Sequence, residues 1–143
     1  VEMARSRLRA NDFTLPWIQW ADEHRVLIVE HPEFVPGQWW AKVWEVRPTI
    51  WGPSSLTGGA RDAAILVHEI EHLIEGIGCV SYPGSEGRAT YWQMLAASRL
   101  GADADYVLML YNQWQRYEEA GARSAEPCRT PPESTPSAAR ESE

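Results

Sequence analysis

The sequence predicts a single α+β domain in which a small antiparallel sheet of two or three strands precedes a group of helices. Short runs rich in aromatic and β-branched residues occur before residue 53. From residue 58 to residue 121 the sequence instead has the pattern of three helices separated by glycine-containing breaks. Strands followed by a run of helices are typical of the α+β class.

Length and composition support one folded domain with a short extension. The chain has 143 residues, of which 44% are hydrophobic, and it contains 8 Trp. That is enough for a real core, which we assign to residues 1–121. Residues 122–143 consist mainly of Pro, Ser, Thr, Ala, Arg and Glu, so we expect a disordered tail there.

The part before residue 53 supplies the sheet. Residues 1–10 form a polar lead-in, for which helical structure is an open alternative. Pro16 precedes an apolar run, which predicts a short helix with proline in its first turn. Prolines and a glycine between residues 32 and 37 mark a turn. The runs that predict strands are Val26–Val29, Trp39–Val46 and Thr49–Trp51.

Three helices are predicted after Gly58-Gly59. The first covers about Ala60–Glu75; Asp62 in its first turn suits the helix dipole, and Gly76 with Gly78 predicts its end. Ser85 is a suitable N-cap for a second helix that ends near Leu100. Asp103 is a suitable N-cap for a third helix, which extends to Glu119 before Gly121.

The first of these helices carries the most informative residues of the chain, His68-Glu69-Ile70-Glu71-His72, which read H-E-x-x-H. At about 100° per residue, His68 and His72 are roughly 40° apart on one helix face. Two imidazoles so placed can each give a nitrogen to one Zn²⁺. Glu69 can reach a metal-bound water and act as a general base. The alternative is an amphipathic helix with two solvated or core-satisfied histidines.

With these residues the chain resembles the zincin metallopeptidases, in particular a small gluzincin-like branch. The resemblance covers about residues 60–100. Glu71 stands where the zincin pattern usually has an uncharged residue, and it can be solvated or bond a neighbour. The longer metzincin pattern is absent, because Glu75 and Gly78 occupy its glycine and third-histidine positions.

The resemblance also implies an arrangement of elements and a place for the substrate. It implies the order sheet, motif helix, loop, helix, helix. It further implies an edge strand along the cleft, to which an extended substrate can bind by β-strand addition. The best candidates for that strand are Trp39–Val46 and Thr49–Trp51.

A catalytic zinc ion normally has three protein ligands, so a third is needed. Glu86, in the first turn of the next helix, is our choice, and the glycines and proline of the preceding loop let the chain turn back. The resemblance also places a glutamate on the following helix, and Glu86–Trp92 is similar to the E-x-x-A-x-Y segments of small gluzincin-like proteins. Glu75, two turns after His68, is the rival ligand. An ordinary carboxylate at a helix start is the alternative for Glu86.

Further groups should support the reaction. Each ligand histidine needs an acceptor for its second nitrogen, and a donor should stabilise the oxyanion. Thr90 stands where the thermolysin-type pattern has an aspartate. Candidate acceptors are Glu71, Glu75, Thr90 and Asp103; candidate oxyanion donors are Tyr82, Arg88, Tyr91 and His31, of which we prefer Tyr91.

Charge and hydropathy restrict the partners and the location. The net charge of −7 argues against general nucleic-acid binding. No apolar run approaches the roughly 18–20 residues that span a bilayer, and the N-terminus lacks the apolar core of a signal peptide. Cys79 and Cys128 do not make a disulfide framework, and two free thiols in a reducing cytosol are the simpler account than one bridge. We therefore expect a cytoplasmic protein with neither a nucleic-acid nor a membrane partner, in an oligomeric state that the sequence leaves open.

Together these features predict a zinc-dependent metallopeptidase, with His68, His72 and Glu86 as metal ligands and a peptide or protein as substrate. Glu69 takes the proton of the water and passes it to the leaving amine. The alternative is a regulatory zincin-fold module that binds or clips one specific protein partner. A non-catalytic helical domain with a chance motif is the third hypothesis.

Overall fold

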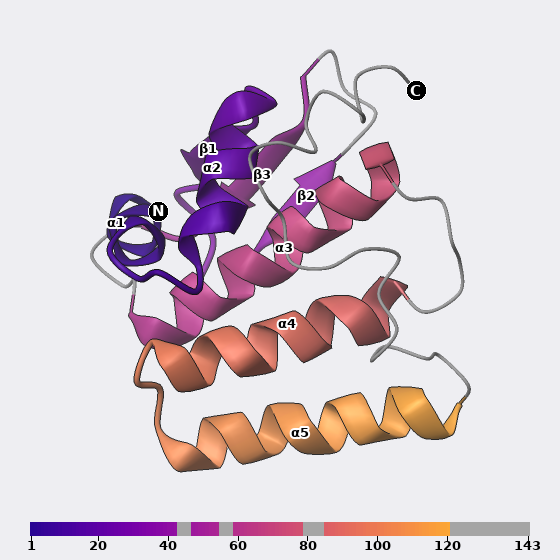
Figure 1. Ribbon diagram of the computed structural model, residues 1–143. Helices are drawn as coiled ribbons and strands as arrows, with labels where there is room; N and C mark the ends of the chain where they lie inside the picture. Colours follow the sequence, from indigo (N-terminus) through magenta and orange to yellow (C-terminus); the bar gives the residue numbers. More distant parts are fainter. Residues whose placement is uncertain (43–46, 55–58, 79–84, 121–143) are drawn as a thin grey trace.

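The computed structural model describes residues 1–42, 47–54, 59–78 and 85–120. Within these residues it contains five helices and one three-stranded sheet, which confirms the predicted α+β class (Figure 1). No helix in this part of the chain combines the length and apolar character needed to cross a lipid bilayer. The expectations about residues 43–46, Cys79, Tyr82, Cys128 and the tail at 122–143 fall outside the described residues.

The N-terminal part begins with two helices, α1 (Glu2–Arg9) and α2 (Leu15–Glu23). The helical alternative for the lead-in is therefore the one observed, and the helix predicted at Pro16 is confirmed, with proline in its first turn. The Asn11 side chain accepts hydrogen bonds from the backbone N–H groups of Phe13 and Thr14, which shapes the turn between the helices.

The sheet consists of β1 (Leu27–Glu30), β2 (Trp40–Lys42) and β3 (Thr49–Gly52), in the order β1-β3-β2. Strand β2 is antiparallel to β3, but β1 is parallel to β3. The sheet is therefore mixed, and the prediction of a purely antiparallel sheet is wrong. Strand β3 lies at the centre of the sheet, between β1 and β2, although it is the last of the three in chain order. It is also the most buried strand, and its Ile50 is fully buried.

The remaining chain forms α3 (Ala60–Gly78), α4 (Ser85–Arg99) and α5 (Ala104–Glu119), which confirms all three predicted helix starts. The helix continues past the predicted Glu75 and through Gly76, and it ends at Gly78, the second of the two glycines that predict its end. Glycine inside a helix costs about 1 kcal/mol, and packing can offset that cost. Figure 1 shows α3, α4 and α5 side by side, with α4 in the middle.

The core lies between α3 and the N-terminal elements. One face of α3 is apolar and fully buried, and Trp17 and Trp20 of α2 are fully buried beside it. Each such side chain contributes about 1.5–3 kcal/mol on burial. This face fixes the rotation of α3 about its axis, so the opposite face, with both histidines, is only half-buried. The buried residues of α3 in this cluster are Ala63, Ala64, Leu66, Val67, Ile70, Leu73 and Ile74.

Asp62 connects the start of α3 to the chain before β2. Its carboxylate is buried and accepts hydrogen bonds from the Gly37 N–H at 2.8 Å and the Trp39 indole N–H at 3.1 Å. The Trp39 ring in turn lies over Gly52 at the end of β3. Asp62 therefore does more than complement the helix dipole, because it also fixes the position of the segment that leads into β2.

The contact between Trp39 and Gly52 gives a stability prediction. A Cβ atom at Gly52 would collide with the Trp39 ring, whereas a Cβ at Gly59 would meet no atom within 4 Å. We expect Gly52→Ala to lower the free energy of unfolding by about 1–3 kcal/mol, because the ring must move. Gly59→Ala, the matched control, should leave it unchanged within about 0.5 kcal/mol. Urea unfolding followed by tryptophan fluorescence measures both, and equal stabilities would contradict the packing described.

Candidate metal centre

Two histidines of α3 form the base of the candidate centre. The His68 and His72 side chains retain 12% and 26% of their accessible surface, and their Nε2 atoms lie 3.1 Å apart. The two rings meet edge to face with centroids 4.7 Å apart. The spacing of one helical turn therefore brings both imidazoles to one point on the open face of α3, as the sequence predicts.

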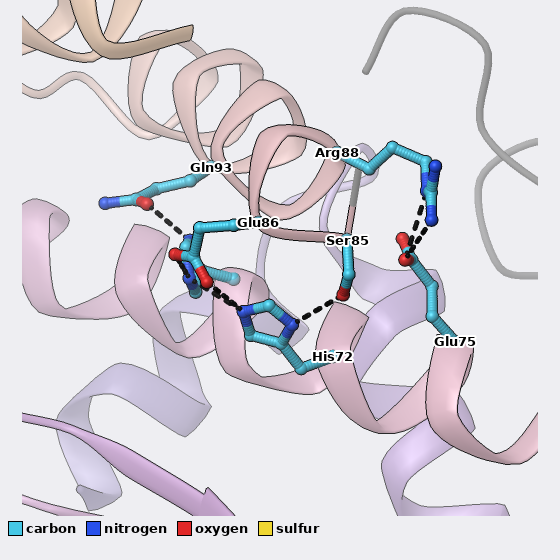
Figure 2. A network of polar contacts seen from close by, with 7 residues as sticks. His72, Glu75, Ser85, Glu86, Arg88 and Gln93 are labelled. Atoms are coloured by element: carbon cyan, nitrogen blue, oxygen red, sulfur yellow. Dashed lines mark hydrogen bonds and ion pairs between the residues drawn. The ribbon is translucent and has the colours of Figure 1, made fainter. Parts of the chain in front are cut away.

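Glu86, in the first turn of α4, completes the group. One carboxylate oxygen lies 2.9 Å from His68 Nε2 and the other lies 3.1 Å from His72 Nε2 (Figure 2). The three ligand atoms lie within 4.8 Å of one another. The structure thus brings together the three residues predicted as metal ligands.

The spacing of these atoms suits a metal ion. Tetrahedral ligands about 2.0–2.1 Å from an ion lie roughly 3.3 Å from one another. The two Nε2 atoms lie 3.1 Å apart, and each has one of the two Glu86 oxygens within 2.9–3.1 Å, which is a few tenths of an ångström from that value. A small divalent cation therefore fits among the three side chains with small rotations.

The second nitrogen of each histidine has its own acceptor. His68 Nδ1 lies 2.8 Å from Gln93 Oε1, and His72 Nδ1 lies 3.0 Å from Ser85 Oγ. Figure 2 shows the contact between His72 and Ser85, with the other ring nitrogen of His72 directed at Glu86. The amide oxygen of Gln93 can only accept, so His68 carries its proton on Nδ1 and keeps Nε2 free for a metal.

The predicted acceptors were wrong, and the actual ones follow from helix periodicity. Gln93 lies two turns after Glu86 on the same face of α4, which the sequence alone could have indicated once Glu86 was chosen. Its amide nitrogen donates to the Tyr106 hydroxyl of α5 at 2.9 Å. Asp103, one of the predicted acceptors, instead pairs with Arg61.

Glu75, the rival third ligand, has a different partner. Its carboxylate oxygen Oε1 accepts from Arg88 Nε at 3.1 Å and Arg88 Nη2 at 3.0 Å, and both side chains are buried, with 1% and 3% exposure (Figure 2). This pair joins the end of α3 to the start of α4. Glu75 is therefore not part of the ligand group, and Arg88 is not the oxyanion donor considered from the sequence.

Glu71, which departs from the zincin pattern, points to the other side of α3. Its carboxylate is 1% exposed and accepts a hydrogen bond from the Trp17 indole N–H at 3.0 Å. It thus bonds a neighbour within the core, which is one of the two alternatives that the sequence left open. Its charge lies away from the open face that holds the histidines.

Glu69 lies on the open side of the centre. It lines a shallow hollow together with His68 and Gln93. Burial raises the pKa of the Glu69 carboxyl, and the nearby histidines partly oppose that shift. A half-buried carboxyl next to the ligand group is well placed to exchange a proton with a molecule bound there.

Without a metal, the ligand group is held together by its own charges. Hydrogen bonds with His68 and His72 lower the pKa of the Glu86 carboxyl well below its usual range. Burial acts to lower the pKa of His72, but its hydrogen bond with Glu86 and the carboxylate charges outweigh burial and raise it. A bound cation would replace the proton that His72 otherwise takes up.

The tyrosine beside the centre is not the one that we prefer from the sequence. The Tyr91 ring packs against Trp92 and Trp114, with centroids 5.0 and 5.4 Å away. The pocket beside His68 and Glu86 is instead lined by Tyr117 of α5, and Tyr91 does not line it. Burial, and secondarily the charge of Glu86, raise the pKa of the Tyr117 phenol, which keeps its proton available for donation.

The remaining candidates from the sequence lie in different places. Thr90 lines the pocket beside Glu86, so it is near the centre although it is not the acceptor of a ligand histidine. His31 stacks on Phe34, with ring centroids 4.2 Å apart, in the segment after β1. Arg116 of α5, which the sequence did not indicate, also lines the pocket. Arg116 and Tyr117 follow the motif by more than forty positions. Their place beside the centre therefore depends on the tertiary structure and has no local signal in the sequence.

Comparisons with protein families, with curated proteins and with solved structures find no match to this chain. The assignment of a function therefore depends on the geometry of the centre. Fold and centre together define an α+β protein with a candidate metal site of two histidines and one glutamate.

The ligand group predicts which glutamate binds metal. Glu86→Gln should weaken the binding of Zn²⁺ or Co²⁺ by at least about tenfold, because an amide is a poor ligand beside two imidazoles. Glu75→Gln, the matched control, should retain a metal affinity close to that of the wild type, because the amide oxygen can still accept from Arg88 and keep α4 in register. It should lose stability, because Arg88 is left with a neutral buried partner. Isothermal titration with each metal and urea unfolding measure the two effects. If Glu75→Gln instead lost the metal and Glu86→Gln kept it, the proposed ligand set would be wrong.

The acceptor of His68 gives a second prediction. Gln93→Ala should weaken metal binding by about 10–100-fold, because the His68 ring loses the contact that sets its tautomer and orientation. Gln113→Ala removes an amide from the same pocket but leaves the bond to His68 in place, so its metal affinity should stay within about threefold of the wild type. Competition with a chromophoric chelator measures both affinities, and equal values for the two variants would exclude the orienting role of Gln93.

Proposed function

We propose that this chain is a zinc-dependent metallopeptidase of the zincin type, which hydrolyses peptide bonds. The observation that carries the proposal is the convergence of His68, His72 and Glu86, with Glu69 beside them on the open face. Two imidazoles and one carboxylate are the ligands of catalytic zinc in several peptidases. Among the described residues the group has three members, which leaves one tetrahedral position for water.

The donor set favours zinc over the hard cations. Calcium and magnesium prefer sites made entirely of oxygen, whereas imidazole suits zinc, copper and iron. The same two histidines and one carboxylate also bind Fe²⁺, so elemental analysis has to decide between the two metals. Glu69 favours zinc hydrolysis, because the H-E-x-x-H pattern supplies a base directly beside the ligands.

Each residue of the centre has a defined task in this proposal. When bound, zinc supplies Lewis acidity, which lowers the pKa of a coordinated water and polarises a substrate carbonyl. Glu69 accepts the proton of the attacking water and returns it to the leaving amine. Gln93 and Ser85 hold the two histidine rings in orientation. Tyr117 is placed to donate a hydrogen bond to the oxyanion.

Strand β2 is the element to which an extended substrate can add. It lies at an edge of the sheet, whereas β3 has a strand on each side, so β3 is excluded as the binding strand. Gly37, just before β2, lines the same hollow as Glu69. A peptide along β2 would therefore extend from the sheet edge towards the centre, with its main chain bonded as an added strand.

The decisive experiment combines metal content with cleavage. We expect purified protein to hold one zinc ion per chain and to cleave a mixture of proteome-derived peptides, with fragments identified by mass spectrometry. Glu69→Gln should keep the zinc and lose activity by about 10²–10⁴-fold, since the base is gone and the ligands remain. Glu119→Gln, at an exposed position of α5, serves as control and should cleave like the wild type. Equal activity of Glu69→Gln and the wild type, or a purified protein without zinc, would refute the proposal.

A further inference from the structure

A continuous groove leads away from the candidate centre along α3 and α5. The pocket beside Glu86 shares His68, Gln93 and Gln113 with the hollow at Glu69. That hollow shares Gly37, Arg61, Ile65 and Tyr106 with a third cavity, of about 500 Å³, near the first turn of α3. The shared lining residues indicate that the centre lies within an elongated depression, and this third cavity forms its far end.

The distance between the cavity and the centre can be expressed in residues of a bound peptide. At about 1.5 Å of rise per residue, Ile65 and Arg61 lie roughly 4.5 and 10 Å along α3 from His68. An extended peptide advances about 3.3 Å per residue. A side chain that enters the cavity would therefore belong to a residue about two or three positions from the bond at the centre.

The wall of the cavity is made of small and apolar residues. Ile65 and Tyr106 supply the large surfaces, and the remaining space exists because the neighbouring positions carry little or no side chain. Gly37 has a φ of +87°, a conformation that favours glycine, so this part of the wall stays open. The small residues that line the cavity are Pro36, Gly37, Gly59, Ala60, Gly101 and Ala102.

The charged groups around the cavity already have partners within the fold. Arg61 Nη2 donates to both carboxylate oxygens of Asp103 at 2.9 Å, and the Arg61 guanidinium lies 4.7 Å from the centre of the Tyr106 ring. One carboxylate oxygen of the buried Asp62 accepts hydrogen bonds from Gly37 and Trp39, and these neutral donors leave its negative charge in place. The Arg61–Asp103 pair attracts ions only weakly and the Asp62 charge disfavours an anionic ligand, so the apolar part of the wall suits an uncharged side chain.

We infer that the cavity is a specificity subsite, which takes a large apolar side chain of the peptide substrate two or three residues from the cleaved bond. The inference rests on the proposed peptidase function, because the groove connects the subsite to the centre. A volume of about 500 Å³ is in the range of ligand pockets and holds an aromatic or long aliphatic side chain. Binding there supplies energy remote from the reacting bond, which raises kcat/KM for peptides that carry such a residue.

The first test fills the cavity. Ala60, the first residue of α3, lines it, whereas Ala104, the first residue of α5, lines a neighbouring hollow with Met94 and Leu108, which has only Ala102 in common with the cavity. The zinc-loaded full chain is profiled on a peptide library for the wild type, Ala60→Phe and Ala104→Phe. We expect the wild type and Ala104→Phe to favour a large apolar residue at one fixed position by about 10–100-fold, and Ala60→Phe to lose that preference.

Several results would overturn the inference. They are the absence of a preference in the wild type, an unchanged preference in Ala60→Phe, or an equal loss in Ala104→Phe. Circular dichroism and zinc content check that each variant is folded and loaded. If Ala60→Phe fails to fold, Gly59→Leu takes its place, because Gly59 lines the cavity and a Cβ atom there meets no atom within 4 Å.

The second test needs no hydrolysis and separates this inference from the proposed function. N-acetyl-tryptophan amide is titrated into the zinc-loaded protein, and NMR signals of Ile65, Ala102 and Tyr106 are followed. We expect these signals to shift in the wild type and in Ala104→Phe but not in Ala60→Phe. If the chain cleaves no peptide while these signals shift, the peptidase proposal fails and the apolar subsite stands. If they do not shift, the subsite is refuted whether or not the chain is a peptidase.

Discussion

The buried ion pair between Glu75 and Arg88 is the contact on which the candidate centre depends. Glu75 comes three residues after His72, and Arg88 comes two residues after Glu86, so the pair joins the two helices beside the ligand group. One Glu75 oxygen is buried with no hydrogen-bond partner among the described residues, which makes the pair costly to bury. Such pairs contribute little net stability, but breaking one costs about 3–5 kcal/mol. What the pair supplies here is register: a shift of α4 by one turn, about 5.4 Å, would separate Glu86 from both histidines.

The rotation of α3 is set independently by its apolar face. Leu66, Ile70 and Leu73 are fully buried against the N-terminal elements, and the indole of Trp17 binds Glu71 on the same side. A rotation of α3 that exposed this face would bring several buried side chains into contact with water, at a cost of about 1.5–3 kcal/mol for each side chain. His68 and His72 are therefore presented outward because of the residues on the opposite face of α3. The core thus fixes the direction in which the two histidines point, and the Glu75–Arg88 pair fixes the position of α4 along α3.

Features that depend on neighbouring residues could be predicted from the sequence, whereas features that depend on contacts between distant segments could not. The starts of α3, α4 and α5 depend on nearby caps and glycines, so Ser85 and Asp103 were sufficient to place them. The pairing of His68 and His72 depends only on helix geometry. Local propensity disfavours Gly76 within a helix, yet α3 continues for two further residues after it. The place of β3 between β1 and β2 and the partner of Glu75 need distant segments to meet, and no local pattern encodes them. Helix periodicity indicates Gln93 only once Glu86 has been chosen as a ligand.

The charges around the centre explain why a cation suits this place. Four glutamates lie on or beside the motif. Glu75 is neutralised by Arg88, and Glu71 is bonded on the core side, so neither adds its charge to the open face. Glu69 and Glu86 remain there, and their two negative charges match those of one divalent ion. The acceptors behind the histidines, Gln93 and Ser85, are neutral and add no third negative charge. A histidine that is hydrogen-bonded to a neutral acceptor donates less electron density to a metal ion than a histidine bonded to a carboxylate. An ion bound here would therefore keep more of its Lewis acidity.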